Sequence, residues 1–123
     1  MIIAIVDDDW ALLELVSVII KKSGHSVYAF SDSEECWEWI SNSSNLCPDA
    51  LITDLMMPYY DGIELISKIR SETHCRNIPI LLISSIDSIG PREDMWDIYI
   101  EKPFTRQQLL EALDKAITMR KQS

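Results

Sequence analysis

Three acidic residues stand where apolar stretches of the chain stop. Asp54 ends the stretch that begins at Ala50, and Asp7 and Asp8 directly follow the apolar run from Ile2 to Val6. Carboxylates that lie close together repel one another, and they stay ionised as a group only when a cation holds them. If the two stretches are neighbouring strands, these residues predict a site for a hard divalent metal ion beside a reactive carboxylate.

Other polar side chains follow further apolar runs. Ser84 and Ser85 end the run from Ile80, and Lys102 precedes Pro103 after the run from Ile98. A carboxylate can attack phosphorus, an ammonium group can place positive charge on a phosphoryl oxygen, and a hydroxyl can donate a hydrogen bond to another. Together with a metal ion, these groups are typical of phosphoryl transfer, in which positioning and charge do most of the catalysis.

The elements that must position these groups alternate along the chain. The first and fourth apolar runs are nearly continuous Ile, Leu and Val, which is typical of parallel strands that are buried on both faces. The predicted strands are Ile2–Val6, Ser26–Phe30, Ala50–Asp54, Ile80–Ser84 and Ile98–Glu101. Helical patterns separate them: an apolar stripe from Leu12 to Ile20, and helices that begin near Ser33, Gly62 and Thr105.

Alternating strands and helices predict an α/β fold with a parallel sheet covered on both sides. In such sheets, ligands bind beyond the carboxyl ends of the strands, where the strand order reverses. The run Ser26–Phe30 ends in Phe30 and offers no functional group, so we expect that strand to lie at one side of the sheet. The other four strands deliver the polar groups.

One segment interrupts the alternation. A helix is expected between Ser84 and Tyr99, but Gly90-Pro91 lies in the middle of this interval. Proline lacks a backbone N–H and disfavours a helical conformation in the residue before it. We therefore expect a fourth helix that is short, distorted or mobile.

Composition limits the possible functions of the chain. Its 123 residues predict a single domain over 1–123, and a net charge of −9 argues against direct binding of nucleic acid. No apolar run approaches membrane-spanning length, and Asp7 to Asp9 interrupt the first one, so neither a signal peptide nor a membrane anchor is expected. The three cysteines, Cys36, Cys47 and Cys75, lack the spacing of a metal site. We expect them to serve as small apolar residues, and their odd, scattered number favours a protein of a reducing, cytoplasmic compartment.

Several residues near the acidic cluster have simpler structural interpretations. Asp9 is expected to cap a helix rather than to bind metal, and Asp61-Gly62 to form a turn and a helix start. Trp37 and Trp39 lie two positions apart on one helix and cannot both face inward, so Trp39 is expected to be exposed. Residues after Thr118 are expected to form a frayed tail.

Four motifs occur in order over nearly the whole chain, and together they resemble the receiver domain of two-component response regulators. They are Val6–Asp9, Ile52–Gly62, Ile78–Ser84 and Tyr99–Phe104. The resemblance implies a flavodoxin-like, doubly wound parallel sheet of strand order 2-1-3-4-5. Compared with most members of this family, the interval from Ser84 to Lys102 is short, and the missing residues fall in the fourth helix.

The resemblance implies a role for each acidic residue. Asp54 accepts a phosphoryl group from the phosphohistidine of a kinase, in a reaction that depends on Mg²⁺. Asp8 binds Mg²⁺ directly, Asp7 contributes through water, and Asp54 is a further ligand. The backbone carbonyl of Met56 completes the protein ligands.

The resemblance assigns the remaining groups to charge compensation and switching. Lys102 pairs with the phosphoryl group, and its bond to Pro103 is the counterpart of a cis peptide that aims the lysine. Ser84 turns toward the phosphoryl group on activation. Tyr99 is the aromatic residue that rotates inward behind Ser84, although ordinary strand packing is the alternative.

The implied function is a signalling switch rather than an enzyme with turnover. Its implied partners are a sensor histidine kinase or phosphotransfer protein, a downstream protein or fused output domain, and a second copy of the chain in a homodimer. One rival is a phosphatase-like hydrolase, which needs a second acid two residues after Asp54, where Met56 stands. The other is a phosphorylation-independent interaction module, which usually loses an acid or the lysine.

Overall fold

The computed structural model describes residues 1–57, 61–85 and 95–121. Strands and helices alternate as predicted, and the five strands have the predicted bounds. The elements in chain order are β1 (Ile2–Val6), α1 (Trp10–Lys22), β2 (Ser26–Phe30), α2 (Ser33–Ser41), β3 (Ala50–Asp54), α3 (Gly62–Glu72), β4 (Ile80–Ser84), β5 (Ile98–Glu101) and α4 (Arg106–Lys121). The predicted fourth helix falls on 86–94, outside the described residues.

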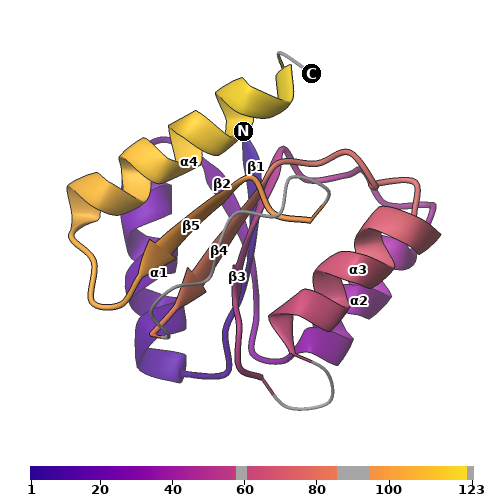
Figure 1. Ribbon diagram of the computed structural model, residues 1–123, viewed down its shortest axis with the longest axis horizontal. Helices are drawn as coiled ribbons and strands as arrows, with labels where there is room; N and C mark the ends of the chain where they lie inside the picture. The colour runs from indigo at the N-terminus through magenta and orange to yellow at the C-terminus, as the bar shows by residue number, and fades with distance from the viewer. Residues whose placement is uncertain (58–60, 86–94, 122–123) are drawn as a thin grey trace.

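All five strands are parallel and form one sheet of order β2-β1-β3-β4-β5. The predicted flavodoxin-like fold and strand order are therefore confirmed, with β2 at one edge. Helices α1 and α4 cover one face of the sheet, and α2 and α3 cover the other (Figure 1). Strand order reverses between β1 and β3, so the carboxyl ends of these two strands form the predicted switch point.

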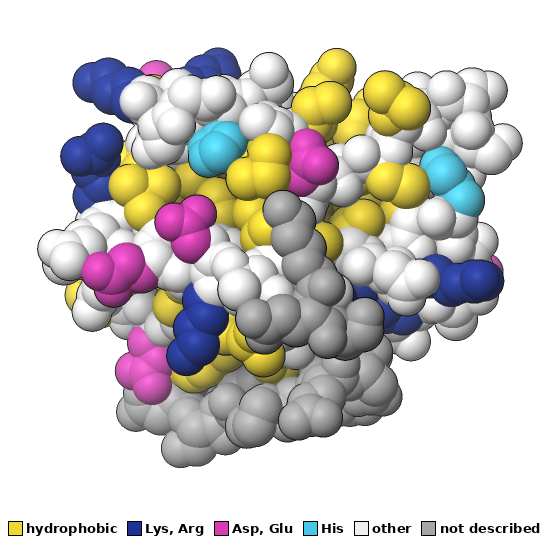
Figure 2. All heavy atoms as spheres, turned by 90° about the horizontal axis from the view of Figure 1, so that it is seen from above, with side chains coloured by type: hydrophobic (Ala, Val, Ile, Leu, Met, Phe, Trp, Pro, Cys, Tyr) yellow, Lys and Arg dark blue, Asp and Glu magenta, His cyan; other side chains and the backbone are white. Residues whose placement is uncertain are grey.

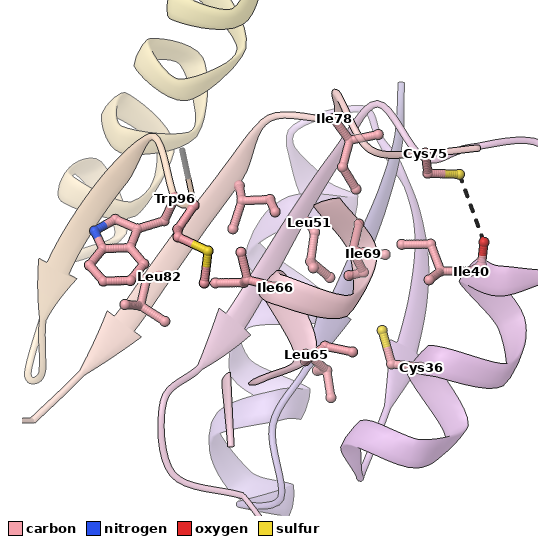
Figure 3. Packing of buried hydrophobic residues seen from close by; sticks show 14 of the residues in the cluster. Cys36, Ile40, Leu51, Leu65, Ile66, Ile69, Cys75, Ile78, Leu82 and Trp96 are labelled. Atoms are coloured by element: carbon pink, nitrogen blue, oxygen red, sulfur yellow. Dashed lines mark hydrogen bonds between the residues drawn. The ribbon is translucent and has the colours of Figure 1, made fainter. Parts of the chain in front are cut away.

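Each face of the sheet has its own hydrophobic cluster. Successive side chains of a strand point to opposite faces, so Ile3 and Ile5 pack toward α1 and α4, and Ala4 and Val6 pack toward α2 and α3. Figure 3 shows the second cluster, in which residues of α3 such as Ile66 contact the central strands. Burying an aliphatic side chain of this size contributes roughly 1.5–3 kcal/mol, so the two clusters fix the strands that carry the acids.

Helix caps follow the sequence signals. The Asp9 side chain accepts hydrogen bonds from the backbone N–H groups of Ala11 and Leu12, at 3.0 and 3.2 Å, so its predicted capping role is confirmed. Before α4, Thr105 Oγ1 accepts from the N–H of Gln108 at 3.1 Å, and Gln108 Oε1 accepts from the N–H of Thr105 at 2.8 Å. These reciprocal bonds satisfy amide groups that the helix itself leaves unpaired.

The prediction of a frayed tail after Thr118 was wrong for residues 119–121, because α4 continues to Lys121, and residues 122–123 lie outside the described residues. Arg120 Nε lies 2.8 Å from Asp97 Oδ1, and Asp97 is a nearly buried side chain in the segment that leads into β5. This contact between elements distant in the sequence holds the last turn of the helix, and no local sequence pattern predicts it.

The expectation that Trp39 is exposed was also wrong. Trp39 is half-buried, and its ring stacks on Tyr28 at a centroid distance of 4.8 Å and lies 5.6 Å from Phe30. Trp37 is half-buried as well, with Lys68 Nζ 4.6 Å from its ring centroid. Trp39 therefore packs on the face of the edge strand β2 that carries Tyr28 and Phe30.

The expectation that the three cysteines act only as small apolar residues was wrong for two of them. Cys47 and Cys75 form a disulfide, and Cys36 is free and buried. The loops that lead into the neighbouring strands β3 and β4 lie side by side, which brings together cysteines 28 residues apart. Among the described helices, none is both long enough and apolar enough to span a membrane.

Candidate functional site

The carboxylates of Asp7, Asp8 and Asp54 converge at the switch point of the sheet. Val6 pairs with Thr53 in the parallel register, so the residues that follow them emerge side by side. One oxygen from each of the three carboxylates lies within 4.8 Å of the others. Asp7 and Asp54 are buried, and Asp8 is exposed, so the cluster opens to solvent on the side of Asp8.

Lys102 bridges the two buried acids. Its Nζ lies 3.1 Å from Asp54 Oδ1 and 3.8 Å from Asp7 Oδ2. The lysine follows β5, and its backbone N–H donates to the carbonyl of Ser84 at 2.8 Å, which extends the β4–β5 ladder to the edge of the site. The Lys102–Pro103 peptide bond is cis, as the resemblance implied.

Burial, rather than charge alone, dominates the electrostatics of the two inner acids. Desolvation raises the pKa of Asp7 to about 6, and the negative charge of Asp54 adds to the rise. The N–H of Asp9, which donates to Asp7 Oδ1 at 2.9 Å, and the ammonium of Lys102 act in the opposite direction. Desolvation likewise raises the pKa of Asp54 above its ordinary value, although the hydrogen bond and charge of Lys102 lower it.

This donor set fits a magnesium ion. Mg²⁺ prefers oxygen ligands and is commonly held by one or two carboxylates together with waters. Here a single lysine faces two buried carboxylates and a third exposed one, so a divalent cation would neutralise the charge that Lys102 leaves uncompensated. Because the cluster opens at Asp8, a hydrated ion has room to keep water ligands.

Asp61 and Gly62 have the predicted structural role. Asp61 caps α3: its side chain accepts from the N–H of Glu64 at 2.9 Å, and Glu64 Oε1 accepts from the N–H of Asp61 at 3.2 Å. Sequence reasoning missed a second constraint at Gly62. A Cβ at this position would overlap the backbone carbonyl oxygen of Asp54, and the N–H of Gly62 donates to the carbonyl of Leu55 at 2.6 Å. The glycine therefore lets α3 start directly against the backbone of the candidate nucleophile.

The remaining predicted residues lie around the cluster. Ser84 ends β4, which pairs with β3, and it is 1% exposed. Tyr99 is half-buried and packs against the cluster that contains Leu82 and Trp96. The side chain of Met56 is 63% exposed. Sequence reasoning also missed the Lys102–Asp7 contact and the Asp9 N–H bond, which become visible only when the strand ends are placed together.

Comparison with known protein families gives one match that spans most of the chain. The model of the response regulator receiver domain matches residues 3–114. This range contains all of the site residues described above.

Curated relatives carry the same family description. The response regulator MprA of Mycobacterium sp. (strain KMS) is 35% identical over 112 residues, which cover 88% of this chain and 46% of the relative. MprA of Mycobacterium avium (strain 104) is also 35% identical, with 88% of this chain and 47% of the relative covered. The chain thus spans about half the length of the curated relatives it matches.

Solved structures agree with this result. A putative response regulator from Chloroflexus aurantiacus J-10-fl has a TM-score of 0.84 and 29% identity, covering 95% of this chain and 97% of that chain. The receiver domain of the Francisella response regulator 1452 has a TM-score of 0.82 and 25% identity, covering 96% and 97%. With its sheet order, its acidic cluster and these matches, the chain belongs to the response regulator receiver domain family, a family of signalling domains in two-component systems.

Proposed function

We propose that this receiver domain is a phosphorylation switch in which Asp54 accepts a phosphoryl group from the phosphohistidine of a histidine kinase or phosphotransfer protein. The observation that carries the proposal is the convergence of Asp54 with two further carboxylates and with Lys102 Nζ at 3.1 Å. Asp54 is the last residue of a buried strand, and the cluster that contains its carboxylate is open to solvent at the exposed Asp8.

In the proposed step, a carboxylate oxygen of Asp54 attacks the phosphorus atom of the donor. A P–O bond forms to Asp54 as the P–N bond to the donor histidine breaks, and the electron pair of that bond stays on the imidazole nitrogen, which takes up a proton. The product is an acyl phosphate. Lys102 balances negative charge on the transferred group, at the place where it now pairs with Asp54.

Asp8, Asp7, Asp54 and the backbone carbonyl of Met56 are the groups that would hold Mg²⁺, with Asp7 acting through a water. When bound, this ion supplies positive charge to the phosphoryl oxygens. The raised pKa values of Asp7 and Asp54 support this assignment, since two buried carboxyls that resist ionisation gain most from a nearby cation.

Phosphorylation would change the surface through charge at the sheet edge. A phosphoryl group adds about −1.5 to −2 charge and new acceptor oxygens. Ser84 lies at the end of the strand next to β3, within reach of an inward turn toward these oxygens, and Tyr99 would follow it inward. We propose these two residues as the switch that changes partner affinity.

The partners follow from the family and from the extent of the match. The upstream partner is a sensor histidine kinase or a phosphotransfer protein, in the cytoplasm. The curated relatives are about twice as long, and the matching region covers 27% of NtrX from Brucella abortus, so receiver folds occur within longer chains. We propose that the output is a fused domain or a separate downstream protein, with a homodimer as one possible active form. The net charge of −9 argues that this domain does not itself bind nucleic acid.

The test is phosphoryl transfer from acetyl phosphate and from a phosphorylated histidine kinase, each with Mg²⁺, followed by intact mass. We expect the wild-type chain to gain a phosphoryl group, Asp54→Asn to gain none, and chelation of Mg²⁺ to abolish the reaction. Asp114→Asn, at an exposed position on α4, is the matched control and should react like the wild type. Equal labelling of Asp54→Asn, or no labelling of the wild type by either donor, would contradict the proposal.

A further inference from the structure

The Cys47–Cys75 disulfide lies at the end of the molecule opposite the acidic cluster. Cys47 belongs to the loop that leads into β3, and Cys75 to the loop that leads into β4. Asp54 and Ser84 end these same strands, so the bond joins the starts of the two strands that carry them. Figure 2 shows the molecule from the side of the strand starts, where histidine side chains lie at the surface beside hydrophobic ones.

The two cysteines of the disulfide differ in solvent exposure. Cys47 is half-buried, whereas Cys75 is 3% exposed and packs in the cluster beneath α2 and α3. Thiol–disulfide exchange begins with the attack of a thiolate on the sulfur that it can reach. This geometry makes Cys47 the sulfur that is attacked and Cys75 the sulfur that leaves.

A histidine lies beside the leaving sulfur. His74 Nε2 is 3.1 Å from the carbonyl oxygen of Asn45 and 3.5 Å from Cys75 Sγ. A carbonyl oxygen only accepts hydrogen bonds, so Nε2 carries the hydrogen and can share it with the sulfur. Burial raises the pKa of the free Cys36 thiol to about 12, and the charge of Asp32 adds to the rise.

The surroundings of Cys75 also offer a hydrogen-bond acceptor to a reduced thiol. Cys75 Sγ lies 3.8 Å from the carbonyl oxygen of Ile40, the contact drawn as a dashed line in Figure 3, so a thiol at Cys75 has an acceptor. The loop around it is held by other bonds: the N–H of Cys75 donates to Thr73 Oγ1 at 3.0 Å, and that hydroxyl donates to the carbonyl of Ile69 at 2.8 Å. None of these contacts depends on the disulfide bond itself.

We propose that Cys47 and Cys75 form a reversible thiol–disulfide switch, in which a small thiol attacks Cys47, and Cys75 leaves with a hydrogen bond from His74. With glutathione as the thiol, its thiolate forms a mixed disulfide with Cys47, the electron pair of the broken S–S bond goes to Cys75, and Cys75 takes up a proton. A second glutathione thiolate then releases Cys47 as a thiol and forms glutathione disulfide. Glutathione disulfide reverses both steps, so two electrons and two protons balance in each direction.

The switch would act on the stability of the chain rather than on the acidic cluster. The disulfide closes a loop of 28 residues and restricts the unfolded chain. Reduction should therefore lower Tm, by at least about 5 °C for a domain of this size.

The first experiment equilibrates the purified chain at several ratios of glutathione to glutathione disulfide, with a chelator present. The chelator matters because Cys47, Cys75 and His74 offer donor atoms within 4.8 Å of one another, and a bound metal would protect the thiols. Alkylation and intact mass then count free thiols. We expect two thiols to appear and disappear together, while the buried Cys36 stays unmodified in the folded chain. Failure of the pair to interconvert at any ratio would overturn the proposal.

The second experiment tests the direction of attack and the role of His74. Reaction with glutathione disulfide should be at least roughly tenfold faster for Cys75→Ser, which leaves Cys47 free, than for Cys47→Ser. His74→Ala should slow reduction of the disulfide severalfold, whereas the matched variant His25→Ala should leave the rate unchanged. Equal rates for the two cysteine variants, or equal rates for the two histidine variants, would refute the proposed mechanism, and the Tm of each variant shows that it is folded.

Discussion

Asp7 is the residue whose chemistry departs most clearly from that of an ordinary surface acid. Asp7 follows a buried strand, its carboxylate accepts a hydrogen bond from the N–H of Asp9, and it lies 3.8 Å from the ammonium of Lys102. Although both contacts lower its pKa, burial raises that pKa to about 6. Asp54 shares the same ammonium, so one positive charge serves two buried carboxyls. The site thus holds more negative charge than its own residues neutralise, which is a cost in the absence of metal and a driving force for binding a cation.

The raised pKa of Asp7 predicts how stability depends on pH in the metal-free protein. Its folded pKa of about 6 lies above the ordinary value of 3.8, so between these pH values the native state binds more protons than the unfolded state. The free energy of unfolding should therefore fall as pH rises through this window, by about 1–3 kcal/mol at most.

Urea unfolding in EDTA from pH 4 to pH 7 measures this effect as the difference between the wild type and Asp7→Asn. The variant should lack this part of the decline and should be the more stable protein at pH 7. Added Mg²⁺ should stabilise the wild type more than the variant. Parallel pH profiles for the two proteins would show that Asp7 does not carry the effect.

At the scale of the elements, the strands could be predicted from sequence because each is a short, mainly apolar run, and four of the five have a candidate site residue at or directly after their carboxyl end. The run Ala50–Asp54 is an example: its length and β-branched content are typical of a buried strand, and the acid marks its end. What could not be predicted depends on which elements become neighbours. Trp39 is half-buried because its helix places it on Tyr28 and Phe30 of β2, and Arg120 in the last turns of α4 contacts Asp97.

The candidate site could also be predicted only in part. The positions of Asp7, Asp8 and Asp54 at strand ends predicted their convergence once the strands were taken as neighbours. The need for glycine at position 62 could not be predicted in this way, because a helix start accepts many residues. Only the approach of α3 to the backbone of Asp54 reveals the constraint.

Gly62→Ala is therefore expected to destabilise the protein, although alanine favours helix. The added methyl group would overlap the carbonyl oxygen of Asp54, and either α3 or the end of β3 must shift. We expect a loss of about 1–3 kcal/mol in the free energy of unfolding, together with slower phosphorylation of Asp54. Ser67→Ala, at an exposed position on the same helix, is the control, and equal effects of the two changes in urea unfolding would refute the steric argument.

Asp97 connects several elements at the entrance to β5. Its Oδ2 accepts from the N–H of Ile80 at 2.8 Å and from Arg70 at 3.3 Å, and its Oδ1 pairs with Arg120. Arg70 also donates to the carbonyls of Met95 and Ile78. This network fixes the chain that leads into β5.

Asp97→Ala should leave two largely buried guanidinium groups without their shared anion. Burial and the charge of Arg120 already lower the pKa of Arg70 to about 10, although Asp97 acts in the opposite direction. We expect a loss of roughly 3–5 kcal/mol in stability, measured by urea unfolding. Asp114→Ala, on the exposed side of α4, should change stability by less than about 0.5 kcal/mol, and a similarly small effect of Asp97→Ala would contradict a structural role for the network.

At the scale of the whole molecule, the two ends of the sheet have different chemistry. The carboxyl ends of the strands carry the acidic cluster and Lys102, and the starts of β3 and β4 carry the Cys47–Cys75 bond. The strands between them are buried on both faces, which makes the sheet a rigid support for either site. Membership of the receiver domain family indicates a role in signalling, and the proposed signal is the phosphorylation of Asp54.

The most direct test of the central claim is to locate the phosphoryl group on the chain. After reaction with acetyl phosphate and Mg²⁺, borohydride reduces an acyl phosphate but not a free carboxylate, and peptide mapping then identifies the reduced residue. We predict that the reduced residue is Asp54 and that Asp7 and Asp8 remain unchanged. Reduction at either of those two acids, or phosphate recovered on a histidine or serine instead, would contradict the assignment of Asp54 as the phosphoacceptor.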